Sequence, residues 1–249
     1  MPSLNPSWVL IAFVLSVCAI RSEDLAAGEF QKFSHNERLS GSTVSGIVSV
    51  AGNHQAPQPL PVFKNRSFCG TAVRNETLLV GPHGGLRNAV VALHALDQKA
   101  AAPPTRVVLD NQRCAFLPHV QVAPLGSELL LKNSDPILHT VHARIGRETL
   151  FNVGLPRWRQ VTKRLDRVGR IRIDCDVLHT WMSAVIIVTR TPYVAVSDEH
   201  GKFVVDGLPA GSYEVEIWHE KLGMKWMKLV VPDDRSISLD VVFAVPQKS

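Results

Sequence analysis

Apolar and polar residues alternate in short runs along most of this chain, and long helical periods are hard to find. Residues 44–50 and 213–218 alternate with a period of two, which is the pattern of a strand with one buried face. Further short apolar runs occur at 78–80, 89–93, 203–205, 227–231 and 237–243. The 16 glycines and 16 prolines favour turns over helix interiors. The pattern predicts an all-β protein.

The densest block of strand-like runs lies between residues 105 and 190. Eight runs separated by short turns are expected there, at 106–109, 119–123, 127–132, 139–145, 149–153, 160–165, 169–174 and 183–189. Regular short strands with frequent turns indicate a Greek-key sandwich.

The segments on either side of this block, residues 41–97 and 191–245, each hold few strands. A sheet needs several strands and a hydrophobic face to be stable by itself. We therefore expect the two segments to be halves of one smaller sandwich, with residues 105–190 inserted between them. Three units in sequence are the alternative. The Pro-containing stretch at 98–104 is the clearest linker.

Residues 1–22 have the pattern of a secretory signal peptide. Their apolar stretch, residues 8–20, is too short for a comfortable membrane span. We expect cleavage between Ala19 and Glu23, followed by a polar leader at 23–40, so that the mature chain is periplasmic or secreted. Lipidation at Cys18 and an uncleaved anchor are the alternatives.

The cysteine count is odd once the signal peptide is removed. Four cysteines are present, Cys18 leaves with the signal, and Cys69, Cys114 and Cys175 remain. An odd number in an exported protein requires an explanation. The simplest one is a Cys69–Cys114 disulfide, with Cys175 kept as a metal thiolate. A buried free thiol at Cys175 is the alternative.

The stretch from Cys175 to Met182 holds a thiol, an imidazole and a thioether within eight residues, and His139 offers a second imidazole upstream. Two histidines, one cysteine and a weak axial methionine are the ligands of a blue-copper site. We therefore predict that His139, Cys175 and His179 are the strong ligands and that Met182 is the axial one. The alternative is a buried cysteine, a core methionine and two unrelated histidines.

Three further residues near these ligands have more ordinary interpretations. His142 lies three positions after His139, so on a strand it points to the opposite face. His119 is expected to pack beside the site or to support a ligand; replacement of a ligand is the alternative. Trp181 could shield the site from water or contact a redox partner, or it could simply pack in the core. Elsewhere in the chain, Asn65 and Asn75 begin Asn-x-Ser/Thr sequences that would be glycosylation acceptors only in a eukaryotic host.

Several stretches of the chain resemble those of known protein families. The segment at 106–190 resembles a cupredoxin, and the chain after the signal is similar to bacterial methylamine-utilization-like proteins. In those proteins a cupredoxin-like segment lies beside a carboxypeptidase-regulatory-like one, a transthyretin-like sandwich with a carbohydrate-binding-like fold. The matching stretches begin at Phe68, Cys114, Asn133, Cys175, Asp198 and Trp218.

The resemblance implies a copper-binding cupredoxin sandwich plus the smaller regulatory-like sandwich. The ligand loop departs from the family in one respect. Relatives usually have two residues between the cysteine and the histidine, whereas three separate Cys175 from His179 here. The extra residue could turn His179 away from the metal.

The distribution of charge and the absence of certain motifs limit the classes of function that the chain can have. Residues 137–190 hold ten Lys/Arg and four Asp/Glu, and a basic surface beside a redox site could steer an acidic electron-transfer partner. Export and the lack of an aromatic-basic motif argue against nucleic acid. An enzyme is not expected, because the loop has no second cysteine and the chain has no His-x-His pair or nucleophile elbow. We expect an exported electron-transfer protein; the alternative is a binding module for a glycan or an envelope partner.

Overall fold

A computed structural model describes residues 41–52, 56–97 and 100–245 of the chain. The predicted signal peptide at 1–22 and the leader at 23–40 lie outside the described residues. The described part is built from strands, with one four-residue α-helix and one short 3-10 helix, η1 (Pro82–Gly84). The all-β fold class is therefore confirmed. No helix in this part of the chain is long and apolar enough to cross a membrane.

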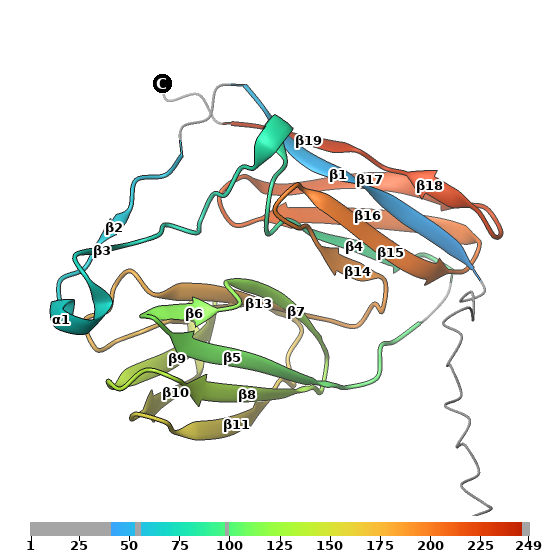
Figure 1. Ribbon diagram of the computed structural model, residues 1–249. Helices are drawn as coiled ribbons and strands as arrows, with labels where there is room; N and C mark the ends of the chain where they lie inside the picture. Colours follow the sequence, from blue (N-terminus) through green and yellow to red (C-terminus); the bar gives the residue numbers. More distant parts are fainter. Residues whose placement is uncertain (1–40, 53–55, 98–99, 246–249) are drawn as a thin grey trace, which may run out of the picture. The chain divides into compact units, whose positions relative to one another are not determined.

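The larger sandwich packs a five-stranded sheet, in the order β10-β9-β12-β13-β7, against a four-stranded sheet, in the order β11-β8-β5-β6 (Figure 1). Alternating apolar residues of the two sheets, such as Leu109, Leu131 and Ile173, meet in one fully buried core. The strands are β5 (Arg106–Gln112), β6 (Ala115–Leu117), β7 (Val120–Pro124), β8 (Glu128–Asn133), β9 (His139–Ile145), β10 (Glu148–Leu155), β11 (Gln160–Arg164), β12 (Gly169–Asp174) and β13 (Ser183–Thr189).

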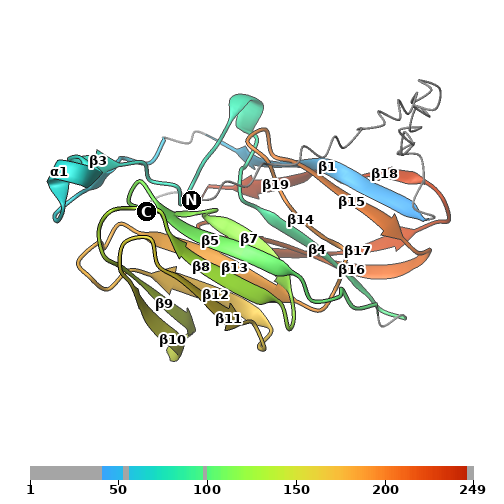
Figure 2. The same ribbon diagram turned by 60° about the horizontal axis from the view of Figure 1, so that its bottom comes forward.

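The smaller sandwich combines strands from before and after that block (Figure 2). In one sheet β1 pairs with β15, β18 and β19, and in the other β4 pairs with β14 and β16, which also pairs with β17. Pairing between strands from before and after residues 105–190 is what the predicted insertion requires. The predicted boundaries at 41–97, 105–190 and 191–245 stay a prediction. The strands are β1 (Ser42–Ala51), β4 (Val90–Ala95), β14 (Val194–Val196), β15 (Lys202–Leu208), β16 (Gly211–His219), β17 (Gly223–Val231), β18 (Ser236–Ser238) and β19 (Val241–Ala244).

The apolar run at 237–243 is divided between two strands, β18 and β19. The interruption lies at Asp240, whose carboxylate accepts a hydrogen bond of 2.8 Å from the amide of Ile47 in place of a backbone carbonyl. The backbone of Leu239 lies close to that of Gly46 in β1. A Cβ at Gly46 would lie 2.0 Å from the carbonyl oxygen of Leu239, so β1 can pass only with glycine at this position.

Residues 60–73 form a structure that the hydrophobic pattern did not predict. Two short strands, β2 (Leu60–Pro61) and β3 (Ala72–Val73), pair with each other and enclose α1 (Arg66–Cys69). At the end of α1, a disulfide joins Cys69 to Cys114 of the larger sandwich, with 5.6 Å between the Cα atoms. The expected pairing of these two cysteines is therefore observed. Residues 78–80, in contrast, form only an isolated bridge from Val80 to Leu86.

Candidate metal centre

Strand pairing brings the two halves of the predicted site together. β9 runs antiparallel to β12, with His142 opposite Asp174, so the start of β9 lies beside the loop that follows β12. His139 is the first residue of β9, and Cys175 is the first residue after β12. The loop then continues through His179 and Met182 to β13. Two segments distant in sequence thus place their donors at one end of the sandwich.

Three donor atoms converge at this end. The Nδ1 atoms of His139 and His179 lie 3.1 Å apart, and Cys175 Sγ lies 3.9 Å from the first and 3.7 Å from the second. A point in the plane of the three atoms lies about 2.1 Å from each of them, close to the length of metal–imidazole and metal–thiolate bonds. The three residues can therefore hold a single metal ion without rearrangement.

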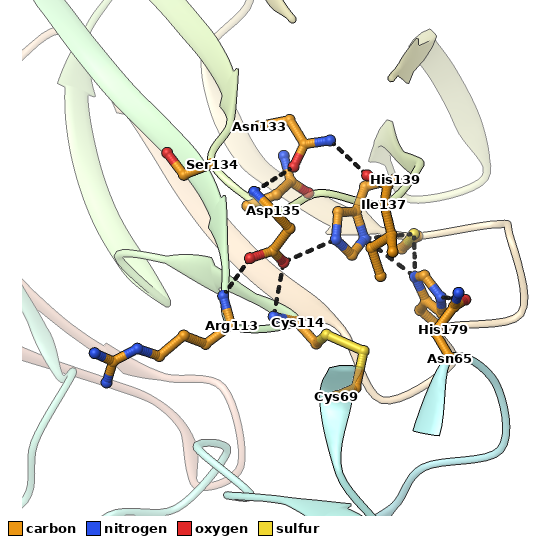
Figure 3. A network of polar contacts seen from close by, with 12 residues as sticks. Asn65, Cys69, Arg113, Cys114, Asn133, Ser134, Asp135, Ile137, His139 and His179 are labelled. Carbon is orange, nitrogen blue, oxygen red and sulfur yellow. Dashed lines mark hydrogen bonds and ion pairs between the residues drawn. A yellow bond between two sulfur atoms is a disulfide. The ribbon is translucent and has the colours of Figure 1, made fainter. Parts of the chain in front are cut away.

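The outer nitrogen of each ring is already engaged (Figure 3). His139 Nε2 lies 2.9 Å from Asp135 Oδ2, and His179 Nε2 lies 2.9 Å from Asn65 Oδ1. Carboxylate and amide oxygens only accept hydrogen bonds, so both rings must carry a proton on Nε2. When both rings are neutral, two Nδ1 lone pairs face each other, and a shared cation satisfies them. This is the arrangement of metal-binding histidines with outer hydrogen-bond partners.

Burial and the neighbouring groups set the protonation of the metal-free site. Burial by itself lowers the pKa of His139, but the hydrogen bonds to Asp135 and Cys175 raise it above its ordinary value. Burial alone raises the pKa of the Cys175 thiol, whereas His139 and the Thr140 amide lower it below its ordinary value. Burial and the charge of His139 lower the pKa of His179 to about 4. The metal-free site therefore shifts the proton balance toward an imidazolium at His139 and a thiolate at Cys175, and keeps His179 neutral at pH 7.

Asp135 is held from both sides. The backbone amides of Arg113 and Cys114 donate to its carboxylate at 2.7 and 2.9 Å, and its own amide donates to Asn133 Oδ1 at 3.0 Å (Figure 3). Burial raises the pKa of Asp135, but the bonds from His139 and these amides lower it below its ordinary value. The carboxylate therefore stays ionised and fixes the His139 ring from behind.

The extra residue of the ligand loop does not turn His179 away. Leu178 takes a left-handed backbone conformation, with φ of 65°, and its side chain is left 63% exposed, while His179 points inward and is fully buried. Met182 is 2% exposed, belongs to the same apolar cluster as Cys175, and its amide donates to the His179 carbonyl at 2.9 Å. The loop thus holds three of the four predicted ligands, all buried, and the fourth, His139, is buried at the start of β9.

Of three residues near the site, Trp181 packs beside His179, whereas His142 and His119 make contacts elsewhere. Trp181 is buried, its ring centroid is 5.0 Å from that of His179, and its Nε1 donates to the Cys114 carbonyl, so it shields the site instead of offering a surface. His142 lies on the other face of β9, 2.9 Å from Asp176. His119 bonds to the Ser183 carbonyl and to Glu220 and offers no atom to the three-donor cluster.

Two residues of the site were not assigned a role from the sequence. Asp135 was visible as an acidic residue four positions before a ligand, in a stretch already singled out. Asn65 was noted only as part of a glycosylation sequence. Nothing in a single sequence connects it to His179, which is 114 positions away.

No family model matches the sequence, and neither does any curated protein. Among solved structures, the chain is similar to a purple cupredoxin from Nitrosopumilus maritimus, with 17% identity and a TM-score of 0.30 over 34% of this chain and 99% of that one. It is also similar to amicyanin from Paracoccus versutus, with 15% identity and a TM-score of 0.31 over 39% and 97% of the two chains. The donor set of two imidazoles and a thiolate suits copper.

Proposed function

We propose that the chain is an exported copper protein that transfers electrons and does not transform a substrate. The observation that carries this proposal is the convergence of Cys175 Sγ with two imidazole Nδ1 atoms, each on a ring whose Nε2 is hydrogen-bonded to a fixed acceptor. His139, Cys175 and His179 would hold the ion, with Met182 as a weak axial ligand.

Electron transfer requires donors that stay in place when the charge of the metal changes. Copper supplies the one-electron chemistry by changing between Cu(I) and Cu(II), and a His2Cys set with a distant methionine is the ligand set of electron-transfer sites. The two histidines are fully buried and Cys175 is 5% exposed. Such burial supports exchange of electrons over binding of a substrate at the metal.

Two features support export and an acidic partner. The Cys69–Cys114 disulfide is of the kind that persists in oxidising compartments. Residues 137–190, with ten basic and four acidic residues, would attract an acidic redox protein. The finer resemblance, to methylamine-utilization-like proteins, stays a prediction.

Copper loading of the purified protein tests the proposal. We expect one copper per chain, an intense visible thiolate-to-copper band, and a paramagnetic resonance spectrum of Cu(II) bound to a thiolate. Zinc loading is the control, because zinc can occupy the same donors without producing colour. Absence of stoichiometric copper, or of the visible band in a fully loaded sample, would contradict the proposal.

The alternative function, a binding module, rests on a different observation. A cleft of about 370 Å³ is lined by residues of both sandwiches, among them Trp218, Arg170 and Glu216. Arg170 lies over the Trp218 ring at 6.0 Å and pairs with Glu216 at 3.1 Å. An aromatic face with charged neighbours could bind a glycan or an envelope partner. Glycan binding that Trp218→Ala abolishes, in a chain that takes up no copper, would favour this function.

A further inference from the structure

The side chain of Asn65, the residue before α1, makes its contact outside that helix. It precedes α1 with φ of 56° and ψ of 34°, a left-handed conformation that asparagine tolerates better than most residues. An asparagine in this position normally caps the helix with its side chain. Here no side-chain cap is formed, and Oδ1 accepts a hydrogen bond of 2.9 Å from His179 Nε2 instead.

The 60–73 segment is fastened on both sides of Asn65. Before it, the Val62 amide donates to the Thr71 carbonyl at 3.0 Å, and the Val62 side chain is buried in the core cluster that also contains Cys175. After it, four residues on, Cys69 is bonded to Cys114. Asn65 is therefore held against the ligand loop by packing on one side and by a covalent bond on the other.

Cys114 connects this fastening to the second imidazole. Its amide donates to Asp135 Oδ2, the atom that contacts His139 Nε2, and its carbonyl accepts a hydrogen bond from Trp181 Nε1 in the ligand loop. In Figure 3, Cys114 lies next to Asp135 and is joined by the disulfide to Cys69. One disulfide thus joins Cys114, whose amide binds Asp135, to the segment that contains Asn65.

We propose that the 60–73 segment is a working part of the metal centre, with Asn65 as a positioning residue for His179 and the Cys69–Cys114 disulfide as the anchor that keeps Asn65 and Asp135 in place. The proposal deepens the copper function and rests on it. Asn65 would keep the proton of His179 on Nε2, so that Nδ1 is free for the metal. Without Asn65, the proton can move to Nδ1 or the ring can turn, and either change removes a donor.

Substitution of Asn65 tests the positioning role. Asn65→Gly removes the amide but keeps a residue that accepts a left-handed backbone, whereas Asn65→Asp keeps an acceptor oxygen. Asn88→Gly is the matched control. Asn88 also has a positive φ, of 65°, but it lies in the smaller sandwich, where its backbone amide donates to the Ser197 carbonyl. The first readout is the ring-nitrogen shift of His179 in the metal-free protein at alkaline pH, where His139 is neutral and does not itself fix the tautomer of His179.

We expect wild type, Asn65→Asp and Asn88→Gly to keep His179 protonated on Nε2, and Asn65→Gly to lose this preference. In a competition titration, copper affinity should fall roughly tenfold to a hundredfold in Asn65→Gly alone, as for other outer hydrogen-bond partners. An unchanged tautomer in Asn65→Gly would overturn the proposal. If the wild type binds no copper but the tautomer still depends on Asn65, the copper function fails while the positioning role survives.

The double variant Cys69→Ser/Cys114→Ser tests the anchor. If it folds, we expect the His179 tautomer to become mixed and the affinity for copper to fall at least as far as in Asn65→Gly. Reduction of the wild-type disulfide with a phosphine, followed by the same nitrogen spectra, serves if the variant does not fold. Wild-type spectra and affinity in a folded chain that lacks the disulfide would overturn the anchoring role.

Discussion

Both sandwiches bury polar groups, but among the described residues only the larger one gathers three donor side chains around one point. In the smaller one, the core cluster is formed by apolar side chains such as Leu93 and Phe243, and the buried Ser197 hydroxyl donates to the Leu86 carbonyl. In the larger one, Asp135 and His139 lie buried at one end and bond to each other. In the first case a polar side chain satisfies the backbone, and in the second titratable side chains are arranged around a common point.

The difference shows where this chain accepts a cost for function. Burying polar groups is unfavourable unless they are hydrogen-bonded. At the end of the larger sandwich the outer atoms of both imidazoles are satisfied, while the two Nδ1 atoms lie 3.1 Å apart. A structural histidine would use both nitrogens for protein contacts. Inward donors with fixed outer partners therefore distinguish a ligand site from a packed core.

The largest effect expected from a single change is that of Cys175→Ser. Removing the thiolate should abolish the intense visible band completely, because the band arises from the thiolate–copper bond. Visible and paramagnetic resonance spectra of copper-loaded protein measure the change. His119→Ala is the control and should keep both copper and colour, because His119 contacts Glu220 and not the donors. Unchanged colour in Cys175→Ser would place the site elsewhere.

Two matched core truncations test whether the sandwiches contribute equally to stability and differ only in their effect on the copper site. Leu93→Ala in the smaller sandwich and Leu131→Ala in the larger one each empty a fully buried site. Both should lower the free energy of unfolding by about 2–5 kcal/mol, measured by urea titration of the metal-free protein. Leu93→Ala should leave the visible band of the copper protein unchanged. A lost band in that variant would mean that the smaller sandwich also shapes the site.

Much of the larger sandwich could be predicted because its strands alternate regularly. The runs at 139–145, 169–174 and 183–189 coincide with β9, β12 and β13, and these strands place the donors. The sequence also indicated which residue types would meet there. Ligand types, strand alternation and turn signals are all local properties, so a single sequence displays them.

The 60–73 segment could not be predicted for the opposite reason. Its strands are two residues long and its helix four, so no hydrophobic period develops. It is held by the disulfide and by contacts such as that from Asn65 to His179, which depend on the folded larger sandwich. A position in space that depends on distant residues leaves no local signal. The cysteine count indicated the disulfide, but not what it holds in place.

Acid should act on the smaller sandwich through His219, the last residue of β16. Burial lowers the pKa of His219 to about 4. The unfolded chain therefore binds a proton below about pH 6.5 that the folded chain refuses until about pH 4, and stability falls as the pH falls through this window. The loss from this one residue is about 3 kcal/mol.

The variant His219→Gln should remove this part of the pH dependence. Urea titrations of the metal-free protein at pH 7 and pH 4.5 should show a smaller difference in the variant than in the wild type. His83→Asn is the control for loss of a histidine outside the core, because His83 is exposed and asparagine tolerates its left-handed backbone. Equal differences in wild type and His219→Gln would contradict a neutral buried His219.

The smallest effect is expected from Met182→Leu, which tests the boundary between ligand and core. Met182 is buried in the apolar cluster of the larger sandwich, and leucine has a similar volume, so the free energy of unfolding should change by less than about 1.5 kcal/mol. The copper protein should keep its colour, because the thiolate and both imidazoles remain. Its reduction potential should rise, since the axial ligand tunes the potential and leucine cannot donate to Cu(II). Protein-film voltammetry measures the potential beside the visible spectrum. An unchanged potential would make Met182 a core residue like Leu131, and the difference between the two sandwiches would then rest on His139, Cys175 and His179 alone.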